Sequence, residues 1–484
     1  MSPTTRLAFI GNSLPRRCGI ATFTTDLQQA ISKSHRGVET AIVAMTDHAR
    51  TYDYPPAVHL QINDENLQDY ARAADFLNTS HFEAVCLQHE FGIFGGDAGN
   101  HILALLSRLT MPIVTTCHTI LSEPRPAQRA VMNEIIDASS KVIVMAEKGR
   151  DLLRTVWTVP PEKIEVIPHG IPDSPFLDPD TAKAKLGFGR KPVILTFGLI
   201  SPNKGIEVMI DAMPSILKLR PDAVYVVLGA THPNLVLREG EAYRESLMAR
   251  VLALGIEPHV VFLDRFVDQP TLLDFISMCD VYVTPYLNEA QMTSGTLAYS
   301  FGLGKAVVST PYWHARELLA DGRGVLVPFG DAKAIGSAIA GLLTDETRRH
   351  AMRERAYASS RSMTWERAAE RYLAIFDKVR RGHPLRVIAR PGESEALPDK
   401  PVPQVQLGHL LSMCDDTGLF QHAVLSVPAR AHGYCVDDNA RALLVACALN
   451  APAERPLPEA LTARFAAFIQ HAWNSDTKRF RNFM

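Results

Sequence analysis

The sequence predicts an α/β fold in which two doubly wound lobes face each other across a cleft, followed by a partial all-α C-terminal segment. First, short runs rich in Val and Ile alternate with longer amphipathic stretches, as in parallel sheets with crossover helices. Second, a proline-rich break near the middle of the chain separates two such series. Third, after another proline-rich stretch only helical patterns return.

Six strands are expected in each lobe. In the first lobe they are residues 6–10, 40–44, 84–88, 112–116, 141–145 and 164–167. In the second lobe they are residues 193–197, 224–228, 260–263, 281–284, 306–309 and 324–327. Because open α/β sheets bind ligands at the carboxyl ends of their strands, we expect the active site in the cleft between the lobes.

The proline-rich stretches divide the chain. Between the lobes lies Pro168–Asp180, where four prolines and one glycine prevent a continuous helix or central strand. A helix from about Thr364 to Arg381 is expected to close the second lobe, and the five prolines in Pro384–Pro403 predict a linker. We therefore expect a first lobe at residues 1–172 and a second lobe at residues 173–381. A linker at residues 382–404 and a helical segment at residues 405–484 are expected to follow.

Composition excludes several classes of protein. The chain has 484 residues, of which 46% are hydrophobic, so it is not disordered over most of its length. The net charge is −2, and the sequence contains no long run of charges of one sign. Nucleic acid is therefore not expected as a partner. Without a signal-peptide core or an apolar run of about 18 residues, a cytoplasmic protein is expected, with transient membrane contact left open. Seven cysteines without a Cys-x-x-Cys pair suit reduced thiols.

The first candidate site follows the strand at residues 193–197. Gly198 ends this strand at the start of the segment Phe197–Gly205. The same segment places Lys204 at the start of a helix that is expected to have an apolar face. Backbone N–H groups, the positive end of the helix dipole and an ammonium group together suit a diphosphate. The alternative is an exposed loop lysine beside a capping glycine.

A second segment repeats this arrangement after the strand at residues 281–284. Glu289 lies in the loop, and Ser294, Gly295 and Thr296 are expected to open a helix. Their N–H groups and hydroxyls suit phosphate oxygens, and a carboxylate beside an anion site suits sugar hydroxyls. The alternative is an ordinary N-cap serine with a solvated glutamate.

Polar residues also follow two strands of the first lobe. His118 follows residues 112–116 and is expected to face the cleft, with a core histidine as the alternative. His89 and Glu90 begin a glycine-containing loop that suits an acceptor. No metal site is expected, because these residues and Cys117 lack the His-x3-His and Cys-pair spacings of zinc ligands.

An ordered set of motifs carries a family resemblance. In the second half of the chain the motifs are Lys204-Gly205, Phe262–Val267, Cys279–Pro285, Glu289, Ser294-Gly295, Gly302–Thr310 and Gly324–Pro328. In the first half they are the glycine-containing loop Pro15–Phe23, Thr116–His118 and Ile167–Gly170. Over about residues 6–380 the chain resembles the retaining glycosyltransferases of family 4, or group 1, whose GT-B fold has two Rossmann-like lobes.

The resemblance implies transfer of a hexose from a nucleoside diphosphate sugar to a glycan, lipid or other acceptor in polysaccharide or glycoconjugate assembly. Retention and independence of metals or other cofactors are implied, since a lysine and helix N-termini neutralise the leaving diphosphate. The implied catalytic residues are Lys204, Glu289 and His118. The implied donor contacts are Gly19, Gly198, Arg265, Phe266, Ser294, Gly295 and Thr296. The implied acceptor-side contacts are Arg16, His89 and Glu90.

Two positions depart from the family pattern. Leu199 stands where an arginine is usual, and Leu297 replaces the second glutamate of a Glu-x7-Glu pattern that begins at Glu289. A subgroup with substitute contacts from Arg265, Tyr299 or Thr296 is one explanation. A catalytically silent sugar-binding module is a second hypothesis, and a GT-B glycoside phosphorylase or nucleotide-sugar epimerase is a third.

The C-terminal segment carries its own polar cluster, Asp415–His422 and Gly433–Arg441. Paired carboxylates among aromatic residues are typical of sugar-processing sites. The helices resemble the opening of an α/α toroid domain of carbohydrate-active enzymes, so part of a larger helical domain is expected. The alternative is that Asp437 or Asp438 caps a helix that begins near Asn439.

Overall fold

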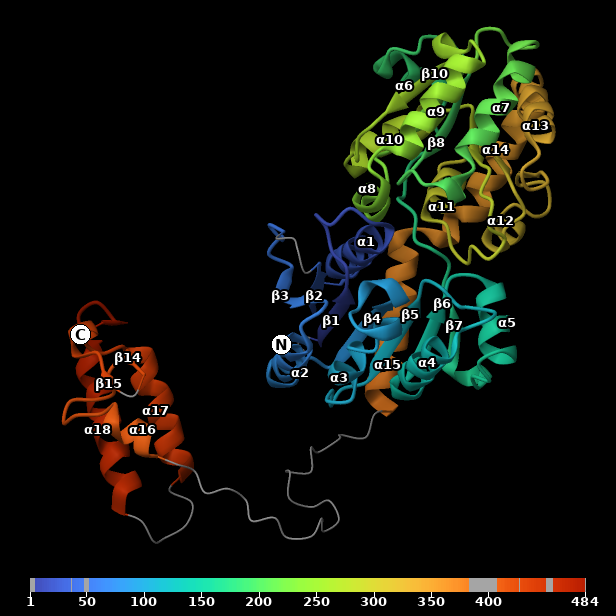
Figure 1. Cartoon of the computed structure of the whole chain (residues 1–484). Helices are drawn as coiled ribbons and strands as arrows, with labels where there is room; N and C mark the ends of the chain where they lie inside the picture. The colour runs from blue at the N-terminus through green and yellow to red at the C-terminus, as the bar shows by residue number, and fades with distance from the viewer. Residues whose placement is uncertain are drawn as a thin grey trace. The chain divides into compact units, whose positions relative to one another are not determined.

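The computed structural model describes residues 5–35, 37–47, 52–382, 407–425, 427–449 and 456–483. The chain divides into two compact units, Met1–Arg390 and Pro391–Met484. The first unit contains two lobes, each built around a parallel sheet with helices on both faces (Figure 1). The predicted two-lobed α/β architecture is therefore confirmed.

The first lobe has a seven-stranded parallel sheet in the order β3-β2-β1-β4-β5-β6-β7. The six predicted strands are present, and β3 was missed. This edge strand has the sequence VHLQIN, and only one of its residues is fully buried, so it lacks the apolar run of the central strands. The strands are β1 Thr5–Gly11, β2 Val38–Thr46, β3 Val58–Asn63, β4 Ala84–His89, β5 Ile113–Cys117, β6 Lys141–Val144 and β7 Ile164–Val166.

Alternate side chains of the central strands enter two separate cores. Leu7 and Phe9 of β1 pack with α1, whereas Ala8 and Ile10 pack with α2 and α3 on the other face. This alternation follows from the two-residue repeat of a strand. The helices of the first lobe are α1 Gly19–Ser34, α2 Leu67–Thr79, α3 Ile102–Leu106, α4 Pro126–Ala138 and α5 Glu147–Thr155.

The second lobe has a six-stranded parallel sheet in the order β10-β9-β8-β11-β12-β13. All six predicted strands are confirmed, as β8 Val193–Phe197, β9 Val224–Leu228, β10 Val260–Leu263, β11 Val281–Thr284, β12 Ala306–Ser309 and β13 Val325–Leu326. The helices are α6 Pro179–Leu186, α7 Ile206–Leu217, α8 Pro233–Glu239, α9 Ala242–Ala253, α10 Gln269–Met278, α11 Gly295–Gly302, α12 Trp313–Leu318, α13 Ala332–Thr344 and α14 Glu346–Ser360. Helices α7, α9 and α13 cover one face of the sheet, and α6, α10 and α11 the other.

Helix α15, Trp365–Gly382, follows the second lobe in sequence but packs on the first lobe. The expectation that it closes the second lobe is therefore wrong. Its residues Tyr372 and Phe376 share a core with Phe9, and the Tyr372 hydroxyl lies 2.8 Å from Thr116 Oγ1. In Figure 1 this orange helix lies among the blue elements of the first lobe, in contact with α1. An amphipathic pattern predicts a helix, but it does not indicate against which hydrophobic core the apolar face of that helix packs.

The chain crosses between the lobes twice, and the two crossings are joined. The Ile171 N–H donates to the Met363 carbonyl at 2.9 Å, and the Trp365 N–H donates to the Ile171 carbonyl at 2.9 Å. Gly170 packs against the indole of Trp365, where a Cβ would lie 2.1 Å from the ring. Only glycine allows this close approach, so the first crossing requires a glycine at position 170.

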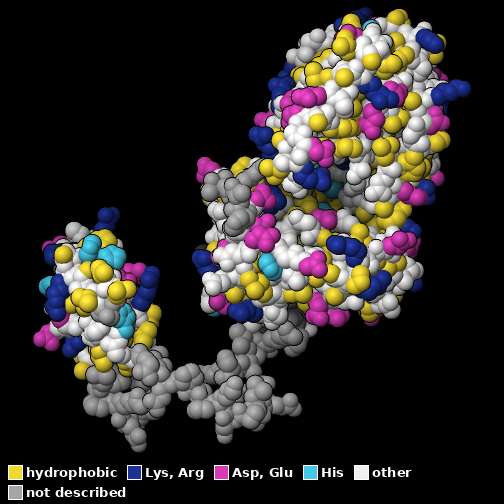
Figure 2. All heavy atoms as spheres, in the orientation of Figure 1, with side chains coloured by type: hydrophobic (Ala, Val, Ile, Leu, Met, Phe, Trp, Pro, Cys, Tyr) yellow, Lys and Arg dark blue, Asp and Glu magenta, His cyan; other side chains and the backbone are white. Residues whose placement is uncertain are grey.

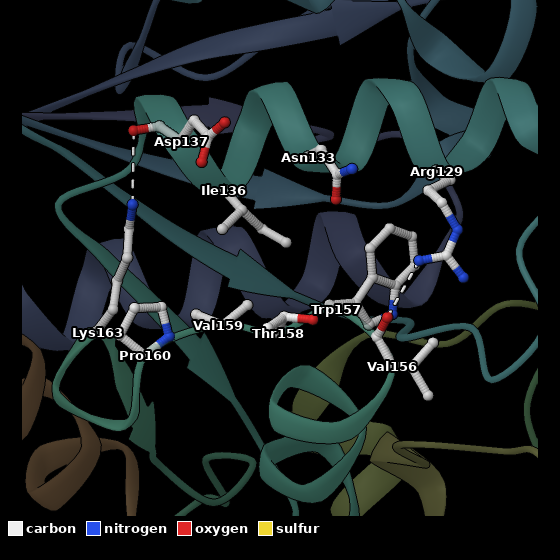
Figure 3. A pocket seen from close by; sticks show the side chains of 10 residues that line it. All are labelled: Arg129, Asn133, Ile136, Asp137, Val156, Trp157, Thr158, Val159, Pro160 and Lys163. Atoms are coloured by element: carbon white, nitrogen blue, oxygen red, sulfur yellow. Dashed lines mark hydrogen bonds between the residues drawn. The ribbon is translucent and has the colours of Figure 1, made fainter.

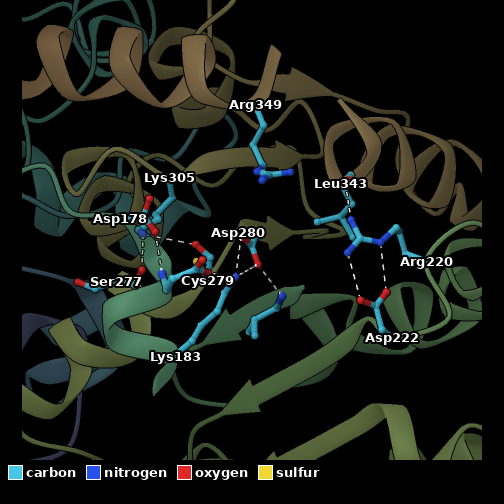
Figure 4. A network of polar contacts seen from close by, with 12 residues as sticks. Asp178, Lys183, Arg220, Asp222, Ser277, Cys279, Asp280, Lys305, Leu343 and Arg349 are labelled. Atoms are coloured by element: carbon cyan, nitrogen blue, oxygen red, sulfur yellow. Dashed lines mark hydrogen bonds and ion pairs between the residues drawn. The ribbon is translucent and has the colours of Figure 1, made fainter. Parts of the chain in front are cut away.

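A network of buried polar contacts fixes α6 to the second sheet (Figure 4). Lys183 Nζ lies 2.9 Å from Asp280 Oδ2, and both side chains are more than nine-tenths buried. Asp280 also accepts a hydrogen bond from the Val193 N–H at 2.8 Å. Lys305 is fully buried, donates to the Ser277 carbonyl at 2.6 Å, and has its pKa lowered to about 8 by burial. These contacts lie at the amino ends of β8, β11 and β12, the edge opposite the predicted cleft.

The second unit is small and helical. Its core residues Ala446 and Phe465 join α17 to α18. Helix α17 begins at Val436, so Asp437 and Asp438 lie in its first turn, and the alternative that either caps a helix near Asn439 is wrong. The elements are α16 Gly408–Ser412, α17 Val436–Leu449, α18 Pro456–Ala472, and the paired strands β14 Ala423–Val424, β15 Val427–Pro428, β16 Trp473–Asn474 and β17 Arg479–Phe480.

Carboxylates of the second unit make local contacts. Asp415 accepts hydrogen bonds from the Thr417 and Gly418 N–H groups, and Asp437 pairs with Arg441 at 2.6 Å. A separate glycan-handling role for them stays a prediction. The predicted linker Pro384–Pro403 lies outside the described residues. Across the described ranges, none of the helices combines the length and apolar character needed to cross a bilayer.

The buried pair of Lys183 and Asp280 gives a stability prediction. Lys183→Met leaves the Asp280 carboxylate buried without its cation, so the free energy of unfolding should fall by about 3–5 kcal/mol. Lys185→Met is the matched control, because Lys185 pairs with Asp274 but is 64% exposed and should contribute less than about 1 kcal/mol. Denaturant titration of the full chain measures both. Equal losses for the two variants would contradict this role of the buried pair.

Candidate functional site

The candidate segments follow the strands at the two points where strand order reverses. In the first lobe β1 lies beside β4, and residues 16–19 and 90 follow these strands. In the second lobe β8 lies beside β11, and residues 198–204 and 286–296 follow them. Open α/β sheets bind ligands in the crevices at such points. In both lobes the predicted segments therefore lie at the carboxyl edge of the sheet, where ligands bind.

Lys204 lies in a short turn, Pro202–Lys204, immediately before α7. Its ammonium nitrogen lies 3.9 Å from the centroid of the Tyr286 ring, a cation–π contact. Gly205 has a φ of +64°, and a Cβ there would lie 2.0 Å from the carbonyl oxygen of Pro285. The loops after β8 and β11 are thus packed closely together, with the lysine over the aromatic ring.

The amino end of α11 carries a cluster of hydroxyl groups. Ser294 caps the helix, because its Oγ accepts from the Leu297 N–H at 3.3 Å, and its own N–H donates to His314 Nδ1 at 2.9 Å. Thr296 Oγ1 lies 3.1 Å from Ser294 Oγ and 3.0 Å from the Tyr286 hydroxyl. The predicted helix start at residues 294–296 is confirmed. Tyr286 contacts both its hydroxyl groups and the ammonium of Lys204.

Tyr286 is almost fully buried at the centre of this cluster. Burial raises the pKa of Tyr286, but the charge of Lys204 and the hydroxyls of Ser294 and Thr296 outweigh it, and the pKa falls to about 8. Its ring stacks on Tyr312 with the centroids 5.0 Å apart. A phenol and an ammonium group are thus held together beside a helix N-terminus.

His169 connects this cluster to the first lobe. A Cβ at Gly295 would lie 3.0 Å from His169 Nε2, and the His169 ring lies 5.1 Å from the ring of Phe23 in α1. Phe23 in turn lies 4.9 Å from the ring of His118. His118 Nε2 lies 2.9 Å from Gln88 Oε1 at the end of β4. The amino ends of α11 and α1 and the carboxyl ends of β4 and β5 therefore meet.

The histidines of this region are neutral at physiological pH. Burial lowers the pKa of His118 to about 3, of His169 to about 4 and of His314 to about 3. Positive charge comes instead from Lys204 and the helix N-termini. Within the described ranges, no group of three or more His, Cys, Asp and Glu side chains is arranged to hold a metal ion.

The first lobe contributes an open helix N-terminus. Cys18 caps α1, with its Sγ accepting from the Ala21 N–H at 3.3 Å. A Cβ at Gly19 would meet no atom within 4 Å, so the space beside this turn is open. Arg16 forms an ion pair with Asp47 at 2.5 Å, which fixes its guanidinium. Figure 2 shows the surface hollowed between the two lobes, with basic, acidic and histidine side chains around the hollow.

Three predicted residues make contacts outside this cluster. The Glu289 carboxylate is half-exposed and pairs with Arg316 at 2.8 Å. The Arg265 guanidinium lies over the Phe275 ring at 5.7 Å, and Phe266 is 40% exposed. The structure does not join these side chains to Lys204 and the amino end of α11.

The acceptor-side segment begins later than expected. Strand β4 continues through His89, whose fully buried ring lies near the rings of Phe91 and Phe94. Burial lowers the pKa of His89 to about 4, and neither ring nitrogen has a hydrogen-bond partner among the described residues. Its placement in the loop after this strand is therefore wrong. Glu90 begins the loop, is buried against Thr119, and has its pKa raised by burial.

Two interlobe residues differ from the sequence expectations. The Tyr299 hydroxyl donates to Asp26 of α1 at 2.5 Å and accepts from Trp365 Nε1 at 3.3 Å. Burial raises the pKa of Asp26 to about 6. Tyr299 thus bridges the lobes. Neither Asp26 nor Tyr286 was singled out from the sequence, because nothing local shows that Asp26 contacts the second lobe or that Tyr286 contacts Lys204.

A cavity of about 440 Å³ lies elsewhere on the first lobe, between α4 and residues 156–163 (Figure 3). Arg129 and Lys163 lie toward opposite ends of it in this view. The Arg129 guanidinium lies 5.2 Å from the Trp157 ring and donates to the Val156 carbonyl at 3.1 Å. Its lining residues include none of those predicted from the sequence, so this cavity is separate from the candidate site.

Comparison with known proteins identifies two family models and several relatives. Residues 18–174 match "Glycosyltransferase Family 4", and residues 178–359 match "Glycosyl transferases group 1". A D-inositol 3-phosphate glycosyltransferase of Jonesia denitrificans is 25% identical over 56% of this chain. The lipopolysaccharide core biosynthesis mannosyltransferase LpsB of Rhizobium meliloti is 28% identical over 45% of this chain and 61% of its own length. The matches span 63–68% of four inositol phosphate glycosyltransferases, so they cover only part of these relatives.

Solved structures share the fold. HepE of Anabaena, crystallised with UDP, superposes with a TM-score of 0.62 at 17% identity, covering 77% of this chain and all of that chain. Sucrose-phosphate synthase of Thermosynechococcus elongatus gives a TM-score of 0.63 at 18% identity, covering 78% of this chain and 100% of that chain. These similarities establish the GT-B fold. With both lobes matched in order, the chain belongs to the family 4, group 1 glycosyltransferases.

Proposed function

We propose that the protein transfers a hexose from a nucleoside diphosphate sugar to a glycan, lipid or other acceptor, with retention at the anomeric carbon. The observation that carries this proposal is the unbroken line of contacts from Lys204 through Tyr286 and the amino end of α11 to His169, Phe23 and His118. This line joins a cation and a helix N-terminus of one lobe to polar groups of the other. A donor bound there would have its diphosphate and its sugar in contact with different lobes.

Lys204 and the amino end of α11 are the proposed diphosphate-binding groups. The ammonium charge and the first N–H groups of the helix stabilise negative charge that develops on the leaving group. The space beside Gly19 in the first turn of α1 is open, so the positive end of this helix in the facing lobe can also approach the diphosphate. We propose that these groups replace a metal ion or other cofactor. HepE, which shares the fold, was crystallised with UDP, and this supports a nucleoside diphosphate as the bound product.

His118 is proposed to contact the transferring sugar. Because Gln88 Oε1 is an acceptor, His118 Nε2 carries the proton in that hydrogen bond and Nδ1 is left as an acceptor. A neutral imidazole of fixed orientation suits a sugar hydroxyl better than a phosphate. Glu90 and Arg16 stay proposed acceptor-side residues. Seven free thiols are in keeping with a cytoplasmic site for this reaction.

Two observations favour a second candidate, a sugar-binding module without catalytic activity. Glu289, the proposed sugar contact, is paired with Arg316, and Leu297 is fully buried in the core of the second lobe. A panel of UDP- and GDP-sugars, with and without simple glycosides as acceptors, separates the two functions. Release of nucleoside diphosphate supports the transferase, and binding without release supports the silent module. The anomeric coupling constant of the product, measured by NMR, tests retention.

Lys204→Ala tests the proposed diphosphate site. Loss of the ammonium should lower turnover by about 10²–10³, comparable to removing one group that stabilises an oxyanion. Nucleoside diphosphate release measures the effect. Lys218→Ala is the matched control, because Lys218 is an exposed residue at the opposite end of α7. Unchanged turnover in a folded Lys204→Ala protein would contradict the proposed site.

Leu297→Glu tests whether the family's second glutamate can be restored. Leu297 is fully buried among apolar residues of the second lobe, so a carboxylate there would be desolvated and unpaired. We expect unfolding free energy to fall by several kcal/mol and donor binding to weaken. Leu297→Met keeps the volume and should cost less than about 1.5 kcal/mol. Calorimetric titration that shows clearly tighter donor binding by the Glu variant would prove this reasoning wrong.

A further inference from the structure

Tyr286 follows the strand β11 and is the residue through which Lys204 contacts the amino end of α11. Its side chain is 3% exposed, although it carries a polar hydroxyl. That hydroxyl lies 3.0 Å from Thr296 Oγ1 and 3.5 Å from Ser294 Oγ. One aromatic side chain thus contacts the cation on one loop and the helix cap on the next.

The backbone around Tyr286 is also fixed. Its carbonyl accepts from Thr310 Oγ1 at 2.6 Å, and its ring stacks on Tyr312, whose own hydroxyl lies 3.1 Å from Thr284 Oγ1. The loop that carries Lys204 is packed against the loop that carries Tyr286, since a Cβ at Gly205 would lie 2.0 Å from the Pro285 carbonyl oxygen. The ammonium of Lys204 thus lies over the Tyr286 ring, 3.9 Å from its centroid, without a bound ligand.

We propose that Tyr286 is a positioning residue that holds Lys204 through its ring and, through its hydroxyl, joins this cation to Ser294 and Thr296 in one preformed diphosphate site. This inference rests on the proposed function, because it assigns a role at the same donor site. A preformed cation loses less freedom on binding, which favours affinity.

The proposal has a consequence for pH dependence. While the phenol is protonated, the Lys204 charge is available to a diphosphate; once the phenol ionises, its negative charge neutralises the ammonium and opposes the anion. Because the pKa of Tyr286 is about 8, the affinity for a nucleoside diphosphate should be full near pH 7 and fall as pH rises through 8. A tyrosine that only fills the core would give no such fall.

Other titratable groups facing this cluster do not change charge in that range. Burial raises the pKa of Tyr282 in β11 and of Tyr312 before α12, so both stay neutral. Burial lowers the pKa of His314, which binds Ser294, to about 3. Burial and the Lys204 charge also lower the pKa of His232, so it is neutral above pH 7. Tyr286 is thus the group of this cluster whose ionisation falls between pH 7 and 9.

Calorimetric titration of the full chain with UDP and with GDP tests the proposal. For the wild-type protein, the affinity for the nucleotide that binds should fall about tenfold between pH 7 and pH 9. Tyr286→Phe keeps the ring but removes the hydroxyl, so it should bind about fivefold more weakly at pH 7 and lose the fall toward pH 9. Tyr225→Phe is the matched control, because this buried tyrosine of the same lobe bonds Thr196 and should keep the wild-type pH profile.

A second measurement does not depend on a variant. Tyrosinate absorbance of the wild-type protein should show one residue ionising near pH 8, and bound nucleotide should shift that ionisation to higher pH, because linkage is reciprocal. An unchanged pH profile in Tyr286→Phe, or a tyrosinate titration that nucleotide does not shift, would overturn the proposal while leaving the proposed function in place. Failure of the wild-type protein to bind either nucleotide would instead contradict the proposed function, and this inference with it.

Discussion

The paired crossings at Ile171 and Thr364 are the constraint on which the interlobe site depends. Two backbone hydrogen bonds join them, and Gly170 lets the Trp365 indole pack against the first crossing. Trp365 then begins α15, which is buried in the core of the first lobe. Since both chain crossings lie side by side, relative motion of the lobes must turn about this pair. The ring contacts of Phe23 with His169 and Trp365 lie next to this pair.

The electrostatics of the site follow from unequal contributions of the two lobes. The second lobe supplies a fixed ammonium and a helix N-terminus lined with hydroxyls, which suit phosphate. The first lobe supplies neutral imidazole groups, and burial raises the pKa values of its carboxyl groups Glu90 and Asp26. Neutral hydrogen-bonding groups suit sugar hydroxyls. One cleft can therefore hold the charged and the uncharged parts of a donor on facing surfaces.

Local sequence features predicted most strands and the amino end of α11, because continuous apolar runs and a serine cap act within a few residues. Features that depend on which parts of the chain pack against each other were not predictable. The stripe of α15 did not reveal which lobe it covers, and β3 at the sheet edge lacks an apolar run. Nothing near Tyr286 in sequence shows that Lys204, 82 positions earlier, lies over its ring. Glu289 was chosen by motif, yet its carboxylate pairs with Arg316.

We infer that a nucleoside diphosphate binds between Lys204 and the amino end of α11. A crystal structure of the full chain with UDP or GDP tests it most directly. We expect phosphate oxygens within hydrogen-bond distance of Lys204 Nζ and of the Gly295 and Thr296 amides, with the sugar-side phosphate directed toward His118. A diphosphate bound elsewhere, for example in the cavity between Arg129 and Lys163, would contradict it.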